Sequence, residues 1–234
     1  MVVVLNPEVA DGTEEIAATF GARIIRHPFA NFRDQKNVAL DYATQPWILA
    51  LDADEVVSPE LKQAIFDFFA NRPEQFAGAQ FPRKTWFMGQ WITHGDWYPD
   101  RVLRLFQKSQ GKWGGGSPEH CHVELAGSCA TLPADLLHYS NPTISSYVQK
   151  MNYFADAHLE RQLARGARWS APSVVARVAW RFGRAYFLRR GFLDGYPGFF
   201  IAASTAYSTL VRHSRLFEHL QPTDPTTCDP AKSH

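Results

Sequence analysis

The sequence predicts an α/β domain followed by a helical region, and three observations lead to this prediction. Short apolar runs that suit strands alternate with amphipathic stretches near the N-terminus. One of these runs ends directly in two carboxylates, and the C-terminal part combines helical spacing with many arginines. Alternating strands and helices indicate a parallel sheet covered by helices, with its ligand site beyond the carboxyl ends of the strands.

The first elements are short and alternate in type. Val2–Val4 is β-branched and predicts a strand, and the turn at 11–13 starts a helix from Glu14 to Phe20. We expect a second strand over 22–25 and an amphipathic helix over 32–43. The apolar strand that starts at Trp47 is predicted to be buried on both faces.

Two carboxylates, Asp52 and Asp54, directly follow this strand. Hard divalent cations take oxygen ligands, and Mg²⁺ commonly uses one or two carboxylates together with substrate phosphates. The pair therefore suits a metal-bridged, phosphorylated substrate. A solvated turn before the next helix, with Ser58 as N-cap and Pro59 in the first turn, is the structural alternative.

Composition narrows the class of protein. The chain has 234 residues, is 45% hydrophobic and carries a net charge of +1, which suits one domain plus an appendage and argues against a general nucleic-acid binder. No signal-peptide pattern is present, and the apolar stretch from Gly198 to Val211 is too short and too polar to span a membrane. Three cysteines provide no disulfide framework, so we expect a cytoplasmic protein.

A zinc site is a weaker interpretation. The run His120-Cys121-His122 offers zinc ligands, but Cys129 and Cys228 do not supply a second cluster at a recognised spacing.

The C-terminal region predicts three helices, over about 145–165, 172–190 and 197–217. From Arg161 to Arg215 there are ten arginines and one acidic residue, Asp194, with aromatic residues between them. Basic helices with aromatic faces commonly lie on anionic membranes, although a helical lid with solvated arginines has the same pattern. The expected divisions are an α/β domain over 1–143, the helical region over 144–220 and a disordered tail over 221–234.

Several segments together resemble the family 2 glycosyltransferases of the GT-A fold, most closely the branch that decorates lipopolysaccharide cores. The segments are Val2–Val4, 11–17, Gln35–Leu40, Trp47–Glu55, Gly95–Asp100, Arg104–Phe106, Leu136–Ser140 and Gly191–Gly198. The resemblance covers nearly the whole chain. It implies a GT-A-like, Rossmann-like mixed sheet flanked by helices, with a C-terminal helical appendage.

The resemblance also implies a donor site. Asp52 and Asp54 would hold Mg²⁺ or Mn²⁺ against the diphosphate of a nucleotide-sugar donor, which stabilises the charge of the departing nucleoside diphosphate. Asp11, Gln35 and Lys36 would contact the donor together with Asp52, although Lys36 equally suits a solvated helix position.

Inverting transfer also needs a general base near the acceptor hydroxyl. Candidates are Asp96, Asp100, Glu119 and Glu124. The family places an acidic residue beside a histidine in the second of these regions, so we predict Glu119 as the base, with Asp100 as the second catalytic candidate.

The chain departs from the family at its start. Family members begin with another strand and helix, and this sequence begins at what would be their second strand, so we expect an N-terminally truncated fold. A missing strand would leave an apolar edge that favours association with a partner chain or a homo-oligomer.

The resemblance predicts transfer of a sugar to a lipid-linked saccharide in lipopolysaccharide core biosynthesis. The enzyme would work in the cytoplasm, with peripheral contact at the inner face of the cytoplasmic membrane. Two alternatives stay open: a non-catalytic protein that keeps the fold, and a metal-dependent phosphotransferase with Asp52 as nucleophile, which Glu55 argues against.

Overall fold

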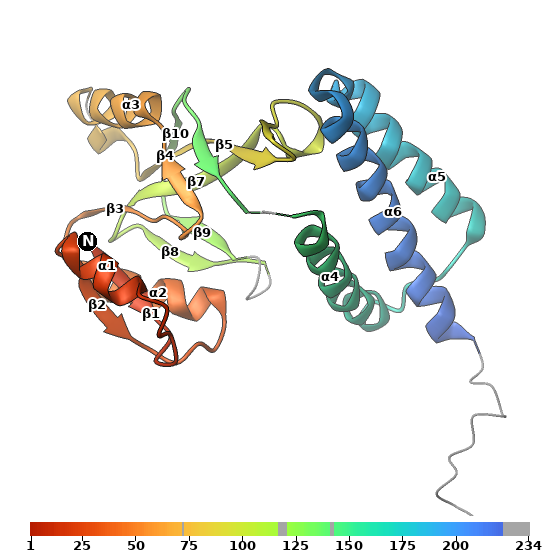
Figure 1. Cartoon of the computed structure of the whole chain (residues 1–234), viewed down its shortest axis with the longest axis horizontal. Helices are drawn as coiled ribbons and strands as arrows, with labels where there is room; N and C mark the ends of the chain where they lie inside the picture. The colour runs from red at the N-terminus through yellow and green to blue at the C-terminus, as the bar shows by residue number, and fades with distance from the viewer. Residues whose placement is uncertain (72, 117–120, 141–142, 222–234) are drawn as a thin grey trace, which may run out of the picture. The chain divides into compact units, whose positions relative to one another are not determined.

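The computed structural model describes residues 1–71, 73–116, 121–140 and 143–221, and its chain forms two compact units. Unit 1 comprises Met1–Lys84 and Asp100–His138, and unit 2 comprises Thr85–Pro99 and Tyr139–His234. Unit 1 contains most of the strands and unit 2 contains the three longest helices (Figure 1). Within the described ranges, no helix is both long enough and apolar enough to cross a bilayer.

Unit 1 begins with a small parallel pair of strands. β1 (Val2–Leu5) pairs with β2 (Arg23–Arg26), and α1 (Thr13–Thr19) connects them. α2 (Phe32–Tyr42) follows and begins at Asn31, whose side chain accepts a hydrogen bond from the backbone N–H of Asp34. The predicted order of strand, helix, strand and helix is confirmed.

The largest sheet has seven strands, and all of them except β6 and the end of β5 belong to unit 1. Its path is β3–β7–β5–β11–β4, and β6 and β10 also pair with β5. The strands are β3 (Trp47–Leu49), β4 (Glu55–Val57), β5 (Gly78–Phe87), β6 (Gln90–Trp91), β7 (Asp100–Gln107), β10 (Cys129–Thr131) and β11 (Leu136–His138). The pairs β3–β7, β5–β7 and β4–β11 are antiparallel, and β10–β5 is parallel. The sheet is therefore not parallel throughout, as the alternation of strands and helices alone indicated, and the mixed sheet that the resemblance implied is confirmed.

β3 lies at an edge of this sheet. In the part of the chain that the structure describes, β3 pairs with β7 alone, because β1 and β2 form a separate sheet. Leu49 and Leu51 are 39% and 42% exposed. The prediction that this strand is buried on both faces is therefore wrong.

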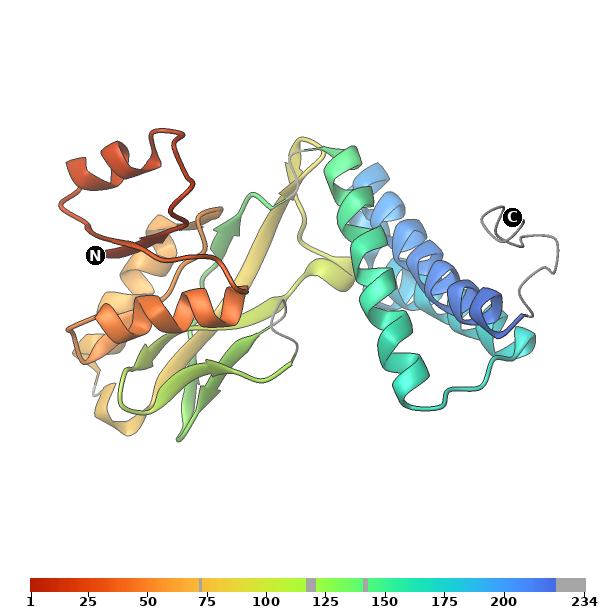
Figure 2. The ribbon, with the colours of Figure 1, turned by 90° about the horizontal axis from the view of Figure 1, so that it is seen from below.

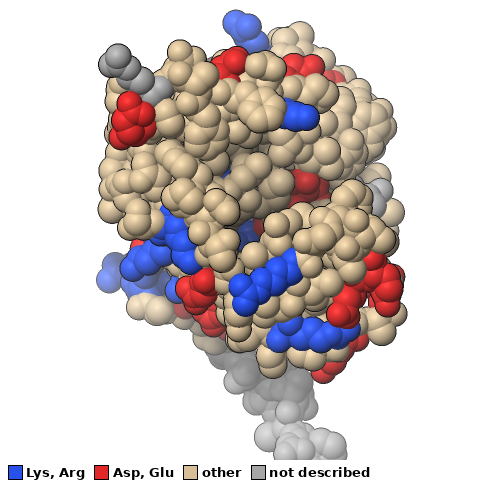
Figure 3. Space-filling view, turned by 90° about the vertical axis from the view of Figure 1, so that its left-hand side faces the viewer, with Lys and Arg blue, Asp and Glu red and all other residues tan. Residues whose placement is uncertain are grey.

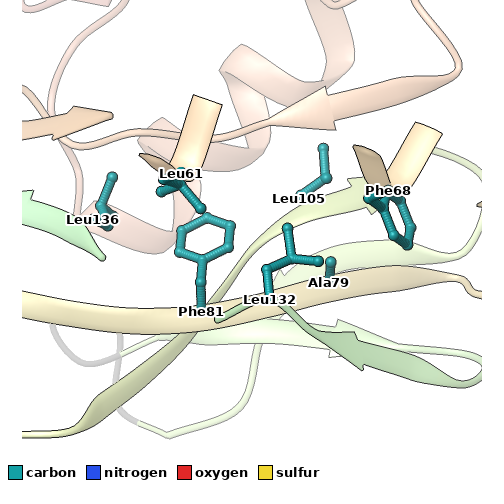
Figure 4. Close-up of a cluster of buried hydrophobic side chains, with 7 residues drawn as sticks. All are labelled: Leu61, Phe68, Ala79, Phe81, Leu105, Leu132 and Leu136. Carbon is teal, nitrogen blue, oxygen red and sulfur yellow. The ribbon is translucent and has the colours of Figure 1, made fainter. Parts of the chain in front are cut away.

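α3 (Pro59–Ala70) covers one face of the sheet. Ser58 is its N-cap, with Oγ accepting from the N–H of Leu61, and Pro59 stands in the first turn as predicted. The helix buries Leu61 and Phe68 against the strands (Figure 4). The cluster consists of Leu61, Phe68, Ala79, Phe81, Leu105, Leu132 and Leu136. This packing fixes the start of α3, and with it the loop that carries the acidic pair.

A second cluster holds α2 against the strands. β8 (Gly111–Gly114) and β9 (His122–Leu125) form an antiparallel ribbon. Trp113 and Val123 from this ribbon pack with Leu40 of α2 and Phe106 of β7. Figure 2 shows α2 on the same side of unit 1 as this ribbon.

Unit 2 contains the three helices expected from the sequence. They are α4 (Ile144–Ala164), α5 (Ala171–Gly183) and α6 (Gly195–Leu220), which lie side by side in Figure 2. A π-helical turn, η4 (Arg184–Leu188), and a 3-10 turn, η5 (Gly191–Asp194), connect α5 to α6. The tail predicted to be disordered lies outside the described residues except for Gln221.

Candidate functional site

The acidic pair lies in the loop between β3 and β4. The N–H of Asp52 donates to Oε2 of Glu55, and the N–H of Glu55 donates to the carbonyl of Asp52, both at 3.0 Å. These two hydrogen bonds close a tight turn around Ala53 and Asp54. The Asp52 side chain is 31% exposed and that of Asp54 is 43% exposed, so Asp54 is the more accessible of the two.

Two cations contact the carboxylate of Asp52. Nζ of Lys36, on α2, lies 2.5 Å from Oδ1, and Nη2 of Arg104, on β7, lies 2.5 Å from Oδ2. Burial raises the pKa of Asp52, but Arg104 and Lys36 together outweigh it, and the pKa lies below its ordinary value. Asp52 is therefore ionised at neutral pH.

The contacts continue into the sheet as a chain of alternating charges. Nη2 of Arg104 lies 2.7 Å from Oε1 of Glu55, and that oxygen also accepts from Nη1 of Arg83 at 3.0 Å. Arg83 then donates from Nε and Nη2 to Oδ2 of Asp100, at 3.0 and 2.7 Å. We call this group the ion-pair chain: Lys36, Asp52, Arg104, Glu55, Arg83 and Asp100. Its three cations and three carboxylates sum to zero charge.

Strand pairing positions the ion-pair chain. Arg83 on β5 stands opposite Asp100 on β7 in the antiparallel register. Burial lowers the pKa of Arg83, but the carboxylates of Asp100 and Glu55 raise it above its ordinary value. The Glu55 side chain is fully buried, so its charge is compensated by the two arginines alone.

The Trp113 ring contacts the two cations that lie beside Asp52 in the ion-pair chain. Nζ of Lys36 lies 4.5 Å from the centroid of the Trp113 ring, and the guanidinium of Arg104 lies 5.3 Å from it. The Asn37 side chain accepts from the N–H of Trp113 and donates to its carbonyl, which fixes the backbone of Trp113 relative to α2. Cation–π contacts of this kind hold both cations beside Asp52.

Asp54 contacts a different element. Its Oδ2 lies 3.4 Å from Nε2 of His138, the last residue of β11. The β4–β11 register places His138 opposite Glu55, which brings this histidine to the acidic loop. Since the ion-pair chain is neutral, Asp54 and His138 leave the site without surplus positive charge.

The donor set of the loop fits a hard divalent cation. Each oxygen of Asp52 already contacts a cation, so the more accessible Asp54 is the better placed ligand. Among the described residues, no group of three His, Cys, Asp or Glu side chains could hold a metal. A cation here would therefore take its remaining ligands from substrate and water, as Mg²⁺ commonly does. His120, part of the weaker zinc interpretation, lies outside the described residues.

The other predicted site residues have local contacts. Oδ1 of Asp11 accepts from the N–H and the hydroxyl of Thr13, and these hydrogen bonds, that from the hydroxyl first, lower the pKa of Asp11. The Gln35 side chain contacts Nδ1 of His27 at 3.2 Å. Glu119, the predicted base, lies outside the described residues.

The two remaining base candidates have cationic or backbone partners. Glu124 accepts from the N–H of Gly115 at 2.8 Å. Asp96 belongs to unit 2, where Arg181, Arg184 and Arg189 surround it.

Of the predicted site residues, the structure brings Lys36, Asp52 and Asp100 into one connected group, with Asp54 in the same loop as Asp52.

A cavity of about 270 Å³ adjoins this group, lined by Lys36, Asp52 and Trp113. Its other walls come from β1, α2 and the outer edge of β3, and they are mostly apolar. Ligand pockets commonly combine apolar walls with a few polar groups at one end.

Charges on the surface of unit 1 are also mixed. In the lower half of Figure 3, Lys and Arg side chains lie next to Asp and Glu side chains, and the upper half is mostly uncharged. A diphosphate would meet no uniformly positive surface on this face.

Sequence reasoning missed the roles of Arg83, Arg104 and Trp113. One signal was available for Arg104, which stands between Leu103 and Leu105 in an apolar strand. A buried arginine needs a carboxylate partner, but the sequence does not say which carboxylate.

Comparisons with known proteins identify a family and several relatives. Residues 1–127 match the family model described as Glycosyl transferase family 2. A protein named as an uncharacterized glycosyltransferase of Rickettsia typhi is 26% identical over 226 residues, covering 93% of this chain and 77% of the relative. The lipopolysaccharide core biosynthesis glycosyltransferase LpsC of Rhizobium meliloti is 22% identical, covering 91% and 83%. Among solved structures, S. aureus TarS matches with a TM-score of 0.42 and 12% identity, covering 92% of this chain and 73% of the TarS chain.

Proposed function

The chain belongs to glycosyltransferase family 2, and from this premise we propose that it transfers a sugar from a nucleotide-sugar donor to a lipid-linked saccharide. The proposed setting is envelope polysaccharide assembly, specifically the lipopolysaccharide core. The similarity to LpsC along most of both chains supports this acceptor class.

One observation carries the proposed donor site: Asp52 belongs to the neutral ion-pair chain and lies two residues from the more accessible Asp54. The site as a whole has no surplus of positive charge. A nucleoside diphosphate carries several negative charges, so it needs a cation to bind next to these carboxylates. We propose Asp54 as the main ligand of Mg²⁺ or Mn²⁺, with Asp52 as the second.

The bound cation would stabilise the negative charge that develops on the departing nucleoside diphosphate. Lys36 has a role of its own, since it lines the cavity next to Asp52 and its Nζ can contact a phosphate oxygen there. Arg104 orients Asp52, and Glu55 orients Arg104 in turn. The apolar walls of the cavity suit the planar base of the nucleotide.

We propose Glu119 as the general base of an inverting transfer. Oδ2 of Asp100 accepts two hydrogen bonds from Arg83, which hold this carboxylate against the guanidinium. Asp100 therefore suits the positioning of Arg83 better than proton transfer. Replacement of a general base commonly lowers kcat by a factor of about 10² to 10⁴.

Sugar transfer tests this function. The purified chain is incubated with labelled UDP-, GDP-, ADP- and CMP-sugars and an envelope glycolipid extract, with Mn²⁺ or with a chelator. We expect metal-dependent label in the glycolipid, reduced by about 100-fold in Glu119→Gln. Asp41→Asn, an exposed carboxylate on α2, serves as the matched control and should retain activity. Label transfer that is unchanged in Glu119→Gln would reject this base, and no transfer from any donor would count against the enzyme.

A further inference from the structure

The turn between α5 and α6 exposes large apolar side chains. Within the ten residues from Phe187 to Tyr196, five such side chains are between 45% and 67% exposed: Phe187, Leu188, Phe192, Leu193 and Tyr196. We call this segment the docking tip; it is the upper end of unit 2 in Figure 1. Contiguous exposed apolar surface on a soluble protein commonly marks an interaction site.

The exposed rings form one continuous surface. Tyr186 contacts Phe187 at 5.1 Å and Phe192 at 6.2 Å between ring centroids. Phe199, at the start of α6, lies 5.9 Å from Tyr186 and 6.4 Å from Tyr196. The patch therefore has aromatic side chains from η4, η5 and α6.

The backbone of the docking tip is held firmly in place. The side chain of Asp194 is 4% exposed and accepts from the N–H and hydroxyl of Thr93 and from the N–H of His94, at 2.8 to 3.1 Å. A Cβ at Gly198 would lie 1.8 Å from the carbonyl oxygen of Gly191, so α6 and η5 are in direct backbone contact. The apolar side chains are thus presented by a fixed turn.

Arginines lie within the docking tip and in the residues just before it. Arg184, Arg189 and Arg181 lie 3.1, 3.5 and 3.8 Å from the carboxylate of one residue, Asp96. Two of these three charges are therefore in excess, and Arg190 adds another exposed guanidinium. The one carboxylate of the segment, Asp194, is buried by its hydrogen bonds and offers no negative group to a partner.

We propose that the docking tip inserts into the interfacial region of an anionic lipid membrane. Aromatic and leucine side chains favour the boundary between head groups and acyl chains, and guanidinium groups bind lipid phosphates in pairs of hydrogen bonds. A second copy of the same chain would place the surplus positive charges of two tips against each other, which disfavours self-association through this surface. The inference rests on the proposed function in one respect, since a lipid-linked acceptor lies in such a membrane.

Vesicle binding tests the docking tip without any sugar transfer. The full chain is titrated with vesicles of phosphatidylcholine and phosphatidylglycerol, and with vesicles of phosphatidylcholine alone. We expect salt-sensitive binding to the anionic vesicles, weakened about tenfold or more in Phe192→Ser/Leu193→Ser. The matched control is Tyr207→Ser/Leu210→Ser, which removes two exposed apolar side chains farther along α6 and should change binding by less than about twofold.

A second variant reports insertion directly. Leu193→Trp adds an eighth tryptophan to the seven of the chain. The difference between its fluorescence and that of the wild type should shift to the blue with anionic vesicles and be quenched by brominated acyl chains. Equal binding by the tip variant and the wild type would overturn the proposal. So would a tip variant that changes the oligomeric state and leaves vesicle binding unaltered, since the surface would then be a protein interface.

Nucleotide binding in the same samples separates the two proposals. If the wild type binds nucleotide but does not bind anionic vesicles, only the docking tip is rejected. Intact vesicle binding by a chain that binds no nucleotide rejects the proposed donor site alone.

Discussion

Glu55 connects Arg83 and Arg104. Because its carboxylate is buried, water cannot take the place of either arginine if one is lost. Its side chain is fully buried and contacts both Arg83 and Arg104, while its second oxygen accepts from the N–H of Asp52. Removing one partner of a buried ion pair leaves an uncompensated charge, which is commonly more costly than losing the attraction itself.

We therefore predict that Glu55→Gln lowers the free energy of unfolding by about 3 kcal/mol, measured by urea denaturation. Glu14→Gln is the matched control, because Glu14 pairs with Arg26 at the surface, where both side chains are about 40% exposed. That change should alter stability by less than about 0.5 kcal/mol. Equal effects of the two substitutions would show that the ion-pair chain contributes no more than a surface pair.

Part of the site could be predicted from the sequence. Asp52 and Asp54 follow an apolar run directly, and this local pattern led to the acidic loop. The partners of Asp52 could not be predicted in the same way, because Arg104 reaches it through the β3–β7 pairing, more than fifty positions along the chain. Likewise, the contact between Arg83 and Asp100 depends on the β5–β7 register, which no local pattern specifies.

At the scale of elements, the contact between η5 and α6 depends on glycine. The Cβ of an alanine at Gly198 would overlap the carbonyl oxygen of Gly191, which belongs to the backbone and cannot rotate away. Gly183, at the end of α5, has no heavy atom within 4 Å of the corresponding position. The two helical glycines therefore differ in how much room each leaves for a Cβ atom.

This difference predicts that replacing glycine by alanine has opposite effects on stability at the two positions. Gly198→Ala should lower the free energy of unfolding of unit 2 by about 2 kcal/mol, because the backbone must shift. Gly183→Ala should leave it unchanged or raise it by up to about 1 kcal/mol, because alanine favours the helix. Thermal melting followed by circular dichroism measures both. A Gly198→Ala protein as stable as the wild type would contradict the close contact.

Two histidines on the helices of unit 2 lead us to predict that stability decreases in acid. His158 on α4 and His213 on α6 lie 6.2 Å apart between ring centroids. Burial lowers the pKa of both below 6.5. Arg212 and then Arg161 lower that of His158 further, and Arg177 and then Arg212 lower that of His213. The unfolded chain therefore binds protons at a higher pH than the folded one, and stability falls as the pH drops below 6.5 through the folded pKa values.

We expect the midpoint of urea unfolding to decrease between about pH 7.5 and about pH 5. The variant His158→Gln/His213→Gln should show a smaller decrease over the same range. An identical decrease in wild type and variant would assign the acid sensitivity to other groups.

Elements with a local signal were predicted well. The three C-terminal helices follow from the spacing of apolar residues, and the structure places them at Ile144–Ala164, Ala171–Gly183 and Gly195–Leu220. Helical spacing did not distinguish the π-helical turn Arg184–Leu188 from a continuation of α5. The position of β3 could not be predicted either, because an apolar run has the same pattern at the edge of a sheet as in its centre.

At the scale of the whole molecule, the two units differ in how their cations are balanced by carboxylates. Unit 1 pairs its cations with carboxylates in the ion-pair chain, whereas arginines exceed carboxylates around Asp96 in unit 2. The net charge of +1 conceals this division. The division of charge supports a metal-dependent donor site in unit 1 and a lipid contact in unit 2.

Calorimetric titration of the full chain with UDP, GDP, ADP and CDP, with and without Mn²⁺, tests the donor site most directly. We predict that at least one nucleotide binds only when Mn²⁺ is present, and that Asp54→Asn weakens this binding by about 10- to 100-fold. Asp41→Asn should bind as the wild type does. A nucleotide that binds a folded chain equally well without the cation, or equally well in Asp54→Asn, would contradict the proposed metal-bridged donor site.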